Sequence, residues 1–204
     1  MEAEPGAPRV AGCRSTSLPG GRRLEIRPVE DGDLDGPVEL FARLSLDDRH
    51  RRFFSVYEPS REIVEHYVET AAGGRGCVLV ACEHNAREEV VGEASYFLQP
   101  DGSGELAITV APDRRGWLGA YLLDALVEAA TAAGVPRLEA DILLENRPMW
   151  ALVRRRGFVH IAGPDTGITR VAISAAEPLG PDAQRDPARA ERYSTQPSRL
   201  ASRG

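Results

Sequence analysis

The hydrophobic period of this chain switches repeatedly between that of a strand and that of a helix, and this feature constrains the fold most. Residues 23–27 alternate apolar and polar side chains, 33–44 repeat at helical spacing, and a second helical segment opens at Ser60. Further elements are expected at 77–82, 90–98, 105–110, 117–133, 138–143, 147–156, 158–161 and 168–173. The order β-α-α-β-β-β-α-β-α-β-β predicts an α/β fold, with a mixed central sheet of about six to seven strands flanked by about four helices.

The two ends of the chain differ in composition from its middle. Residues 1–21 and 177–204 are rich in Gly, Pro, Ser and Ala and show no hydrophobic period. Such composition is typical of disordered segments, because too little apolar surface is available to bury. We therefore expect a disordered leader at 1–21, one folded domain at 22–176 and a disordered tail at 177–204.

Charge and composition argue against several classes of function. The net charge of −6 disfavours a nucleic-acid partner. No apolar run approaches the roughly 20 residues that span a bilayer, and the N-terminus lacks the basic and apolar regions of a signal peptide. We expect a cytoplasmic protein with no membrane partner. The three cysteines form no CxxC pair and the four histidines are scattered, so no metal site is expected. The chain contains no lysine, and all 25 basic residues are Arg.

The segment 104–126, GELAITVAPDRRGWLGAYLLDAL, carries the clearest functional signal. An apolar strand runs into a loop rich in Arg and Gly and then into an apolar helix. The start of such a helix offers unpaired N–H groups and the positive end of the helix dipole, which suits a phosphate group. Many such turns contain Gly for packing alone. The segment by itself is therefore compatible with a phosphate-binding site and with a turn whose glycines serve packing only. It is not a P-loop, since the GK[ST] motif is absent.

This segment resembles the signature of the GNAT acetyltransferases, which is a strand ending V-x-P, a loop of the form [QR]-x-x-G-x-[GA] and an apolar helix. Here these parts are Val110-Ala111-Pro112, Arg114-Arg115-Gly116-Trp117-Leu118-Gly119 and Leu122-Leu123. A later motif of the family, an Asn that leads a helix ending in Gly-Phe, is matched by Asn146 and by Gly157-Phe158. The resemblance covers about residues 24–173.

The resemblance implies the GNAT fold and acetyl-CoA as the acyl donor. It places the donor between the strand that ends at Val110 and the strand 138–143, with the thioester carbonyl near backbone N–H groups. The residues expected to bind it are Ile108, Thr109, Val110, Arg114, Arg115, Gly116, Trp117, Leu118, Gly119, Ala120 and Asn146.

A closer resemblance is to the bacterial protein-lysine acetyltransferase branch of this family. Its early L-S-P-x-x-R-x-x-R-F-F-like element is matched by 44–54, LSLDDRHRRFF, and its A-E-F-A-x-x-V strand by 104–110, GELAITV. The branch implies acetyl transfer to a primary amine, with a protein lysine favoured and Glu105 as the general base. The strand period is compatible, because it separates Glu105, Ala107 and Thr109 from the apolar face. A protonated lysine has to lose a proton before it can attack.

Two basic clusters have alternative interpretations. Near the first motif, Arg49, Arg52, Phe53 and Phe54 are candidates for the acceptor site, although a buried Phe pair beside a solvated Arg face fits equally well. The run 154–156, RRR, ends a predicted helix, where cations favourably face the helix dipole. Contact with a coenzyme A phosphate is the alternative for that run.

Two departures from the family pattern keep other functions open. Trp117 stands where the loop usually has Gly, and only Gly lets a backbone approach phosphate most closely; core packing is the favoured role for Trp117. Val153 stands where many GNAT enzymes carry a Tyr general acid, which favours a Glu-based mechanism. The alternatives are a non-catalytic acyl-CoA-binding regulatory domain and an acetyltransferase for small-molecule amines. Both a monomer and a homodimer are compatible with the sequence.

Overall fold

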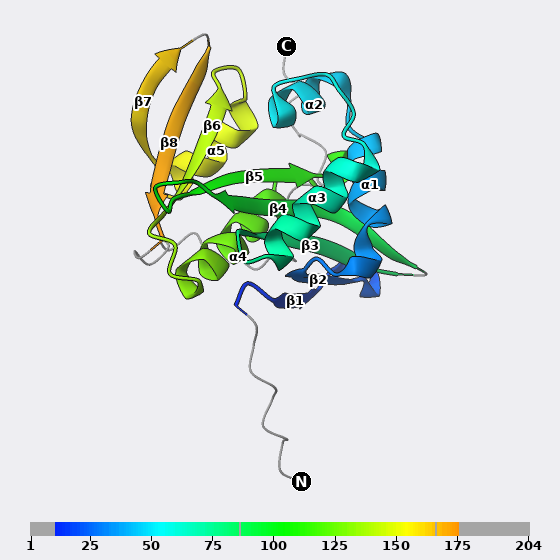
Figure 1. The fold of residues 1–204 in the computed structure, drawn as a ribbon. Helices are drawn as coiled ribbons and strands as arrows, with labels where there is room; N and C mark the ends of the chain where they lie inside the picture. Colours follow the sequence, from blue (N-terminus) through cyan, green and yellow to red (C-terminus); the bar gives the residue numbers. More distant parts are fainter. Residues whose placement is uncertain (1–10, 86, 166, 176–204) are drawn as a thin grey trace, which may run out of the picture.

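One mixed sheet runs through the protein and positions every other element (Figure 1). In the computed structural model, which describes residues 11–85, 87–165 and 167–175, eight strands pair in the order β1-β2-β3-β4-β5-β6-β8-β7. The strands are β1 (Arg14–Ser17), β2 (Arg23–Pro28), β3 (Gly76–His84), β4 (Glu88–Leu98), β5 (Gly104–Val110), β6 (Arg137–Leu143), β7 (Val159–Asp165) and β8 (Ile168–Ser174). The helices are α1 (Asp35–Ala42), α2 (Leu46–Phe53), α3 (Arg61–Ala72), α4 (Leu118–Ala132) and α5 (Arg147–Arg155).

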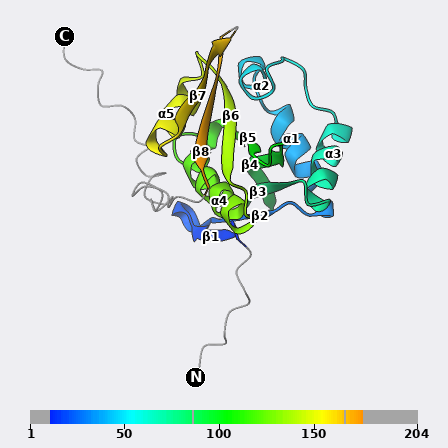
Figure 2. The ribbon, with the colours of Figure 1, turned by 60° about the vertical axis from the view of Figure 1, so that its left-hand side comes forward.

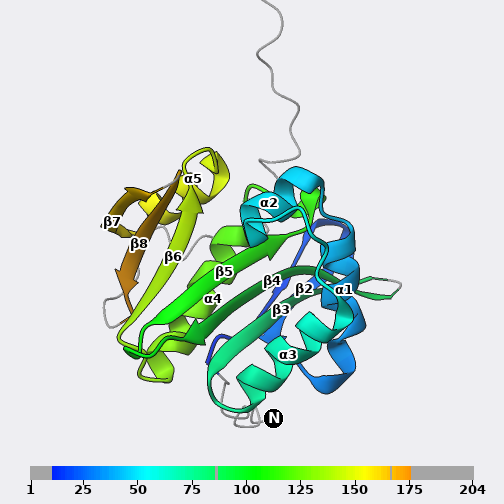
Figure 3. The ribbon, with the colours of Figure 1, turned by 45° about the horizontal axis from the view of Figure 1, so that its top comes forward.

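The sheet is antiparallel except at one place, where β5 lies parallel to β6. Within the described residues, these two strands pair only at their first residues, Gly104 with Leu138 and Glu105 with Glu139. Beyond that point they separate and leave a V-shaped opening in the sheet (Figure 3). Half of the β5 backbone groups beyond Glu105 therefore lack a strand partner on the β6 side.

Helices cover both faces of the sheet, which confirms the predicted layers. The helix α4 packs against β3, β4 and β5 on one face, while α1 and α3 pack against β4 and β3 on the other (Figure 2). At Gly92 a Cβ atom would lie 2.8 Å from Leu122 and 3.1 Å from Leu118, so glycine allows α4 to approach the centre of the sheet. Leu118 and Leu122 are fully buried, and each contributes about 1.5–3 kcal/mol. None of the described helices has the length and apolar character needed to cross a membrane.

The α/β class and the predicted order of elements are confirmed, with one strand and one helix added. The added strand, β1, lies inside the leader 1–21 that was expected to be disordered, so the expectation was wrong for Arg14–Ser17, which pair with β2. The added helix, α2, begins after Ser45, whose Oγ accepts a hydrogen bond from the Asp48 N–H at 3.2 Å. Residues 1–10 and the expected tail 177–204 lie outside the described residues, and the division into one domain with two tails stays a prediction.

Candidate functional site

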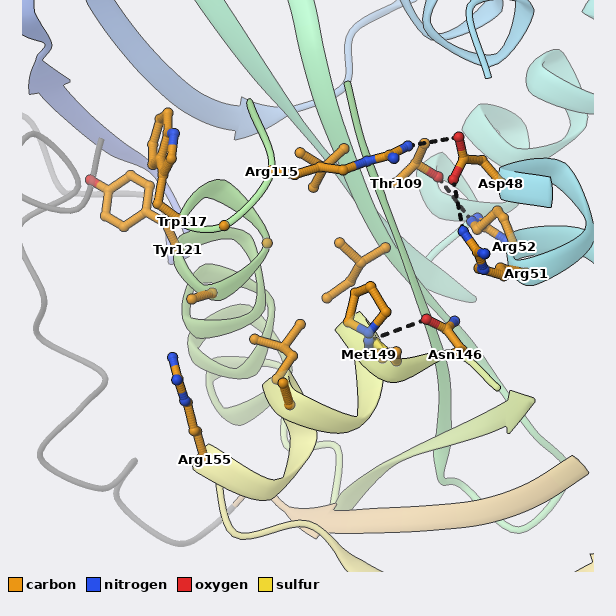
Figure 4. Close-up of a pocket in the computed structure, with 18 of the residues that line it drawn as sticks. Asp48, Arg51, Arg52, Thr109, Arg115, Trp117, Tyr121, Asn146, Met149 and Arg155 are labelled. Carbon is orange, nitrogen blue, oxygen red and sulfur yellow. Dashed lines mark hydrogen bonds and ion pairs between the residues drawn. The ribbon is translucent and has the colours of Figure 1, made fainter. Parts of the chain in front are cut away.

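A cavity of about 510 Å³ opens where β5 and β6 separate (Figure 4). Its walls come from the end of β5, the loop that follows it, the first turns of α4, one face of α5 and one side of α2. This volume lies within the range of ordinary small-molecule sites. All the residues predicted to bind the acyl donor line this cavity except Arg114 and Leu118.

The start of α4 presents backbone N–H groups to this cavity. The first four N–H groups of a helix have no partner inside the helix. Here the N–H groups of Ala120 and Tyr121 bond to the Trp117 carbonyl at 3.2 and 3.4 Å, which leaves the two preceding amides, Leu118 and Gly119, to face the loop. Gly116 has φ +92°, a value that favours glycine and turns the loop into the helix. This arrangement suits an anionic group of a ligand.

Gly119 is a glycine that protein packing does not require. A Cβ atom at this position would lie 3.7 Å from Val110 Cγ2 and 3.8 Å from Leu152 Cδ2, which are ordinary van der Waals contacts. Glycine inside a helix costs up to about 1 kcal/mol relative to alanine. Because Gly119 also lines the cavity, the missing side chain leaves room there for a ligand to approach the backbone.

The two arginines of the loop have different roles. Arg114 lies outside the cavity lining and binds the buried Glu83 of β3 at 2.7 and 3.2 Å, so it anchors the loop to the sheet. Arg115 lines the cavity and forms an ion pair with Asp48 of α2 at 2.8 Å, seen at the upper right of Figure 4. Burial opposes ionisation of Asp48, but hydrogen bonds from Ser45 and Arg115 outweigh it and lower the pKa of the carboxyl.

Among the four candidates for the acceptor site, Arg52 alone lines the cavity. Its Nε donates to Thr109 Oγ1 at 3.1 Å, and its Nη2 lies 3.4 Å from Glu93 Oε2. Arg49 pairs instead with Glu58 at 2.7 Å. Phe53 packs edge-on against Phe41 in the core, and Phe54 is 40% exposed at the C-terminal end of α2. Phe53 therefore fits the alternative of a core Phe. Phe54 does not, and the Arg49 and Arg52 side chains do not form a solvated face, since they are only 14% and 12% exposed.

The α5 wall combines a helix cap with a buried ion pair. Asn146 lines the cavity and caps α5, since its Oδ1 accepts from the Met149 N–H at 3.2 Å. Arg156 binds Asp124 of α4 through two hydrogen bonds, of 2.6 and 3.0 Å. Burial raises the pKa of Asp124 despite this pairing. Arg155 lines the cavity, as the alternative interpretation of the run 154–156 allowed, and Val153 is buried in the core.

Trp117 is 4% exposed and belongs to the hydrophobic core, as expected. It still contributes to the cavity wall, although its ring points away from the opening beside β5 (Figure 4). The loop therefore keeps the free amides of α4 while the large side chain is packed elsewhere.

Glu105 lies at the closed end of the V and does not line the cavity. Its carboxylate is exposed and accepts a hydrogen bond from Gln99 Nε2 at 3.0 Å. Four residues separate it from Thr109, which corresponds to about 13 Å along a strand. The Glu105 carboxylate is therefore separated from the part of the cavity beside Thr109.

Several cavity residues escaped the sequence analysis. They include Asp48 on α2 and Asp124 on α4. The signal for Asp124 was present, because a carboxylate flanked on both sides by apolar residues of a helix is rarely buried without a cationic partner. Asp48 gave no such signal, since α2 has no apolar stripe from which its burial could be expected.

Comparison with known sequences identifies one family. The family described as "Acetyltransferase (GNAT) domain" matches residues 23–159. The acetyltransferase Pat of Mycolicibacterium smegmatis is 31% identical over 160 residues, which cover 75% of this chain and 46% of that protein. An acetyltransferase of Pseudomonas aeruginosa is 30% identical over 153 residues, covering 73% of this chain and 82% of that protein. The chain thus spans less than half the length of the mycobacterial relative.

Solved structures share the same fold. The GNAT domain of PAT from S. lividans superposes with a TM-score of 0.70 at 20% identity, over 82% of this chain and 99% of that one. The acetyltransferase yncA from Salmonella typhimurium, determined with acetyl-CoA, gives 0.63 at 22% identity, over 78% and 98%. A ribosomal-protein-alanine N-acetyltransferase from Brucella melitensis gives 0.60 at 25% identity, over 73% and 98%.

Proposed function

The chain belongs to the GNAT acetyltransferase family, and we propose that it transfers an acetyl group from acetyl-CoA to a primary amine, preferably a lysine of another protein. The observation that carries this proposal is the cavity beside the end of β5, between α4 and α5, into which the start of α4 presents free amides beside Gly119. A donor with a pyrophosphate fits such a site, because N–H groups and the helix dipole both favour negative charge.

Three parts of the cavity would hold the donor. The amides at the start of α4 suit the pyrophosphate, and Arg115 and Arg155 add positive charge on either side. The β5 backbone from Ile108 to Val110 lies beyond the last pair with β6, so its free groups can hydrogen-bond the acyl donor. Acetyl-CoA is a substrate here and supplies the activated acyl group.

The surface next to the cavity supports a protein as the acceptor. The helix α2 forms one side of the cavity, and exposed apolar side chains lie on it and on the loop that follows: Leu46 is 63% exposed, Val56 59% and Tyr57 60%. Exposed apolar groups gathered in one region favour protein contacts. These 204 residues contain no lysine, so none of them can supply the acceptor lysine. The Brucella neighbour is itself named for a protein substrate.

Glu105 is the proposed general base. Its exposed carboxylate would take a proton from the incoming ammonium group, through water, and release it to solvent. The free amine then attacks the thioester directly, and no acyl-enzyme forms.

Titration with acetyl-CoA in a calorimeter, followed by an acetylation assay on proteins and small amines, tests the proposal. We expect the wild type to bind acetyl-CoA with a micromolar Kd and to turn over. In Glu105→Gln we expect kcat to fall at least about 100-fold, while the Kd for acetyl-CoA stays unchanged. Glu69→Gln, an exposed change on α3, is the matched control. Absence of binding would refute the enzymatic role, binding without turnover would favour a regulatory domain, and full activity of Glu105→Gln would exclude this base.

A further inference from the structure

Given acyl transfer as proposed above, two protons have to leave the amine nitrogen. The ammonium group starts with three hydrogens and the amide product keeps one. One proton ends in solvent and the other on the departing sulfur of coenzyme A. Glu105 accounts for the first proton, but the second has to move after the nitrogen has attacked. Val153, where a Tyr acid would stand, is 1% exposed in the core and has no proton to give.

The other titratable groups of the cavity wall are already engaged. Asp48 is paired with Arg115, and Asp124 is held by two hydrogen bonds from Arg156. Tyr121 lies with its ring 5.3 Å from the Arg14 guanidinium, and its hydroxyl points away from β5 (Figure 4). Among the described residues, these groups of the wall are therefore poorly placed to carry the second proton, and a carboxylate just behind the wall is the remaining candidate.

Glu93 is such a carboxylate. It lies on β4 directly opposite Thr109 of β5, and Thr109 lines the cavity. Side chains at directly opposite positions share one face, with Cβ atoms about 4.5–5.5 Å apart. Glu93 is 2% exposed, and its Oε1 has no hydrogen-bond partner among the described residues. An unpaired oxygen on a buried carboxylate is costly, and packing alone gives no reason to keep it.

The surroundings of Glu93 select which oxygen can react. Within ion-pair distance the described residues present one charged group to it, Arg52 of α2, which contacts Oε2. Its neighbours across the sheet are Val80 on β3 and Thr109 on β5. Arg52 also donates to the Thr109 hydroxyl oxygen at 3.1 Å, so the hydroxyl hydrogen of Thr109 is left for another acceptor.

We propose that Thr109 and Glu93 form a proton relay that carries the second proton from the nitrogen to the sulfur. The Thr109 oxygen takes the proton from the nitrogen while its own hydrogen passes to Glu93 Oε1. The two groups do not hydrogen-bond in this structure, so the step requires the Glu93 carboxylate and the Thr109 hydroxyl to turn toward each other. The reverse movement delivers a proton to the sulfur as the C–S bond breaks and the new C–N bond remains. The hydroxyl and the carboxylate end as they began, and no other reactant is needed.

The relay is tested with Glu93→Gln, Thr109→Val and the double variant, using the amine that the wild type acetylates. Each single change keeps the side-chain shape, and we expect each to lower kcat about 100-fold. Because both residues serve one path, the double variant should be no slower than the slower single variant. The acetyl-CoA Kd from calorimetry should stay within about threefold of the wild-type value, since neither change removes the amides of α4.

The pH profile separates the two carboxylates. Raising the pH frees the amine in bulk solvent, because lysine has a pKa of about 10.4, so activity of Glu105→Gln should recover. Activity of Glu93→Gln should not recover, since its proton moves after the attack. Ser95→Ala is the matched control: Ser95 lies two residues further on β4, is 1% exposed, and its hydroxyl likewise has no partner among the described residues. Its kcat should stay within about twofold of the wild type.

Each outcome bears on one proposal or the other. Full kcat in either single variant, multiplied losses in the double variant, or recovery of Glu93→Gln at high pH would overturn the relay while acyl transfer stands. If Glu93→Gln fails to fold, judged by its unfolding transition, Thr109→Val with its pH profile decides alone. A wild type that acetylates no amine would defeat the proposed function and the relay with it.

Discussion

Replacing Gly119 by alanine should change stability and donor affinity in opposite directions. The added methyl would lie 3.7 Å from Val110 and 3.8 Å from Leu152, so it packs without a clash. Alanine is favoured over glycine in a helix by up to about 1 kcal/mol, and less in the first turn, where Gly119 lies. Together with the new apolar contact, we expect Gly119→Ala to raise the free energy of unfolding by about 0.5–1 kcal/mol.

The same methyl projects from the wall of the proposed donor site. Phosphate oxygens reach helix amides most closely where no Cβ stands in the way. We expect the Kd for acetyl-CoA to rise at least tenfold, which corresponds to about 1.4 kcal/mol. A variant that is more stable and binds more weakly would show that the glycine is kept for the ligand.

Urea denaturation and calorimetric titration measure the two effects on the same samples. Gly32→Ala is the matched control, because a Cβ atom there meets nothing within 4 Å and the position is exposed on a short 3-10 turn before α1. It should leave the acetyl-CoA Kd unchanged. If Gly119→Ala gains stability and keeps wild-type affinity, then the donor does not approach the start of α4 and the reasoning is wrong.

Two further predictions concern buried groups of the core. Asp124→Ala should lower the free energy of unfolding, measured by urea denaturation, by about 3–5 kcal/mol, because it leaves the Arg156 guanidinium buried and unpaired. Adding Arg156→Met to that variant should restore most of the lost stability. Burial raises the pKa of the Cys82 thiol from 9.0 to about 12, so its contribution to stability is complete below pH 9 and is lost as the pH rises towards 12. At pH 10.5 the Cys82 contribution has lowered the free energy of unfolding by about 2 kcal/mol. Between pH 8 and 10.5 the free energy of unfolding of Cys82→Ala should therefore fall by about 2 kcal/mol less than that of the wild type. Equal falls in the two proteins would contradict the raised pKa of the thiol.

The order of elements and the cavity wall formed by the end of β5 and the start of α4 could be predicted from sequence because their signals are local. Apolar periods mark each core strand and helix, and the run from Val110 to Gly119 places a strand end, a turn and a helix start in one short segment. Such a segment presents free amides at one point whatever surrounds it. The strand β1 and the helix α2 were missed because neither has an apolar stripe, and the contacts that hold them come from distant elements.

The sequence by itself determined the fold class, the family and the strand–loop–helix segment proposed to bind phosphate, all of which depend on residues close together in the chain. The tertiary structure decided how the charged side chains pair. Arg114 was predicted to bind the acyl donor, but it binds Glu83 and anchors the loop. Arg52 contacts both Thr109 and Glu93 at the cavity wall. Residue spacing carries no information about these contacts, because strand pairing and helix packing bring together side chains that lie 31 to 57 residues apart.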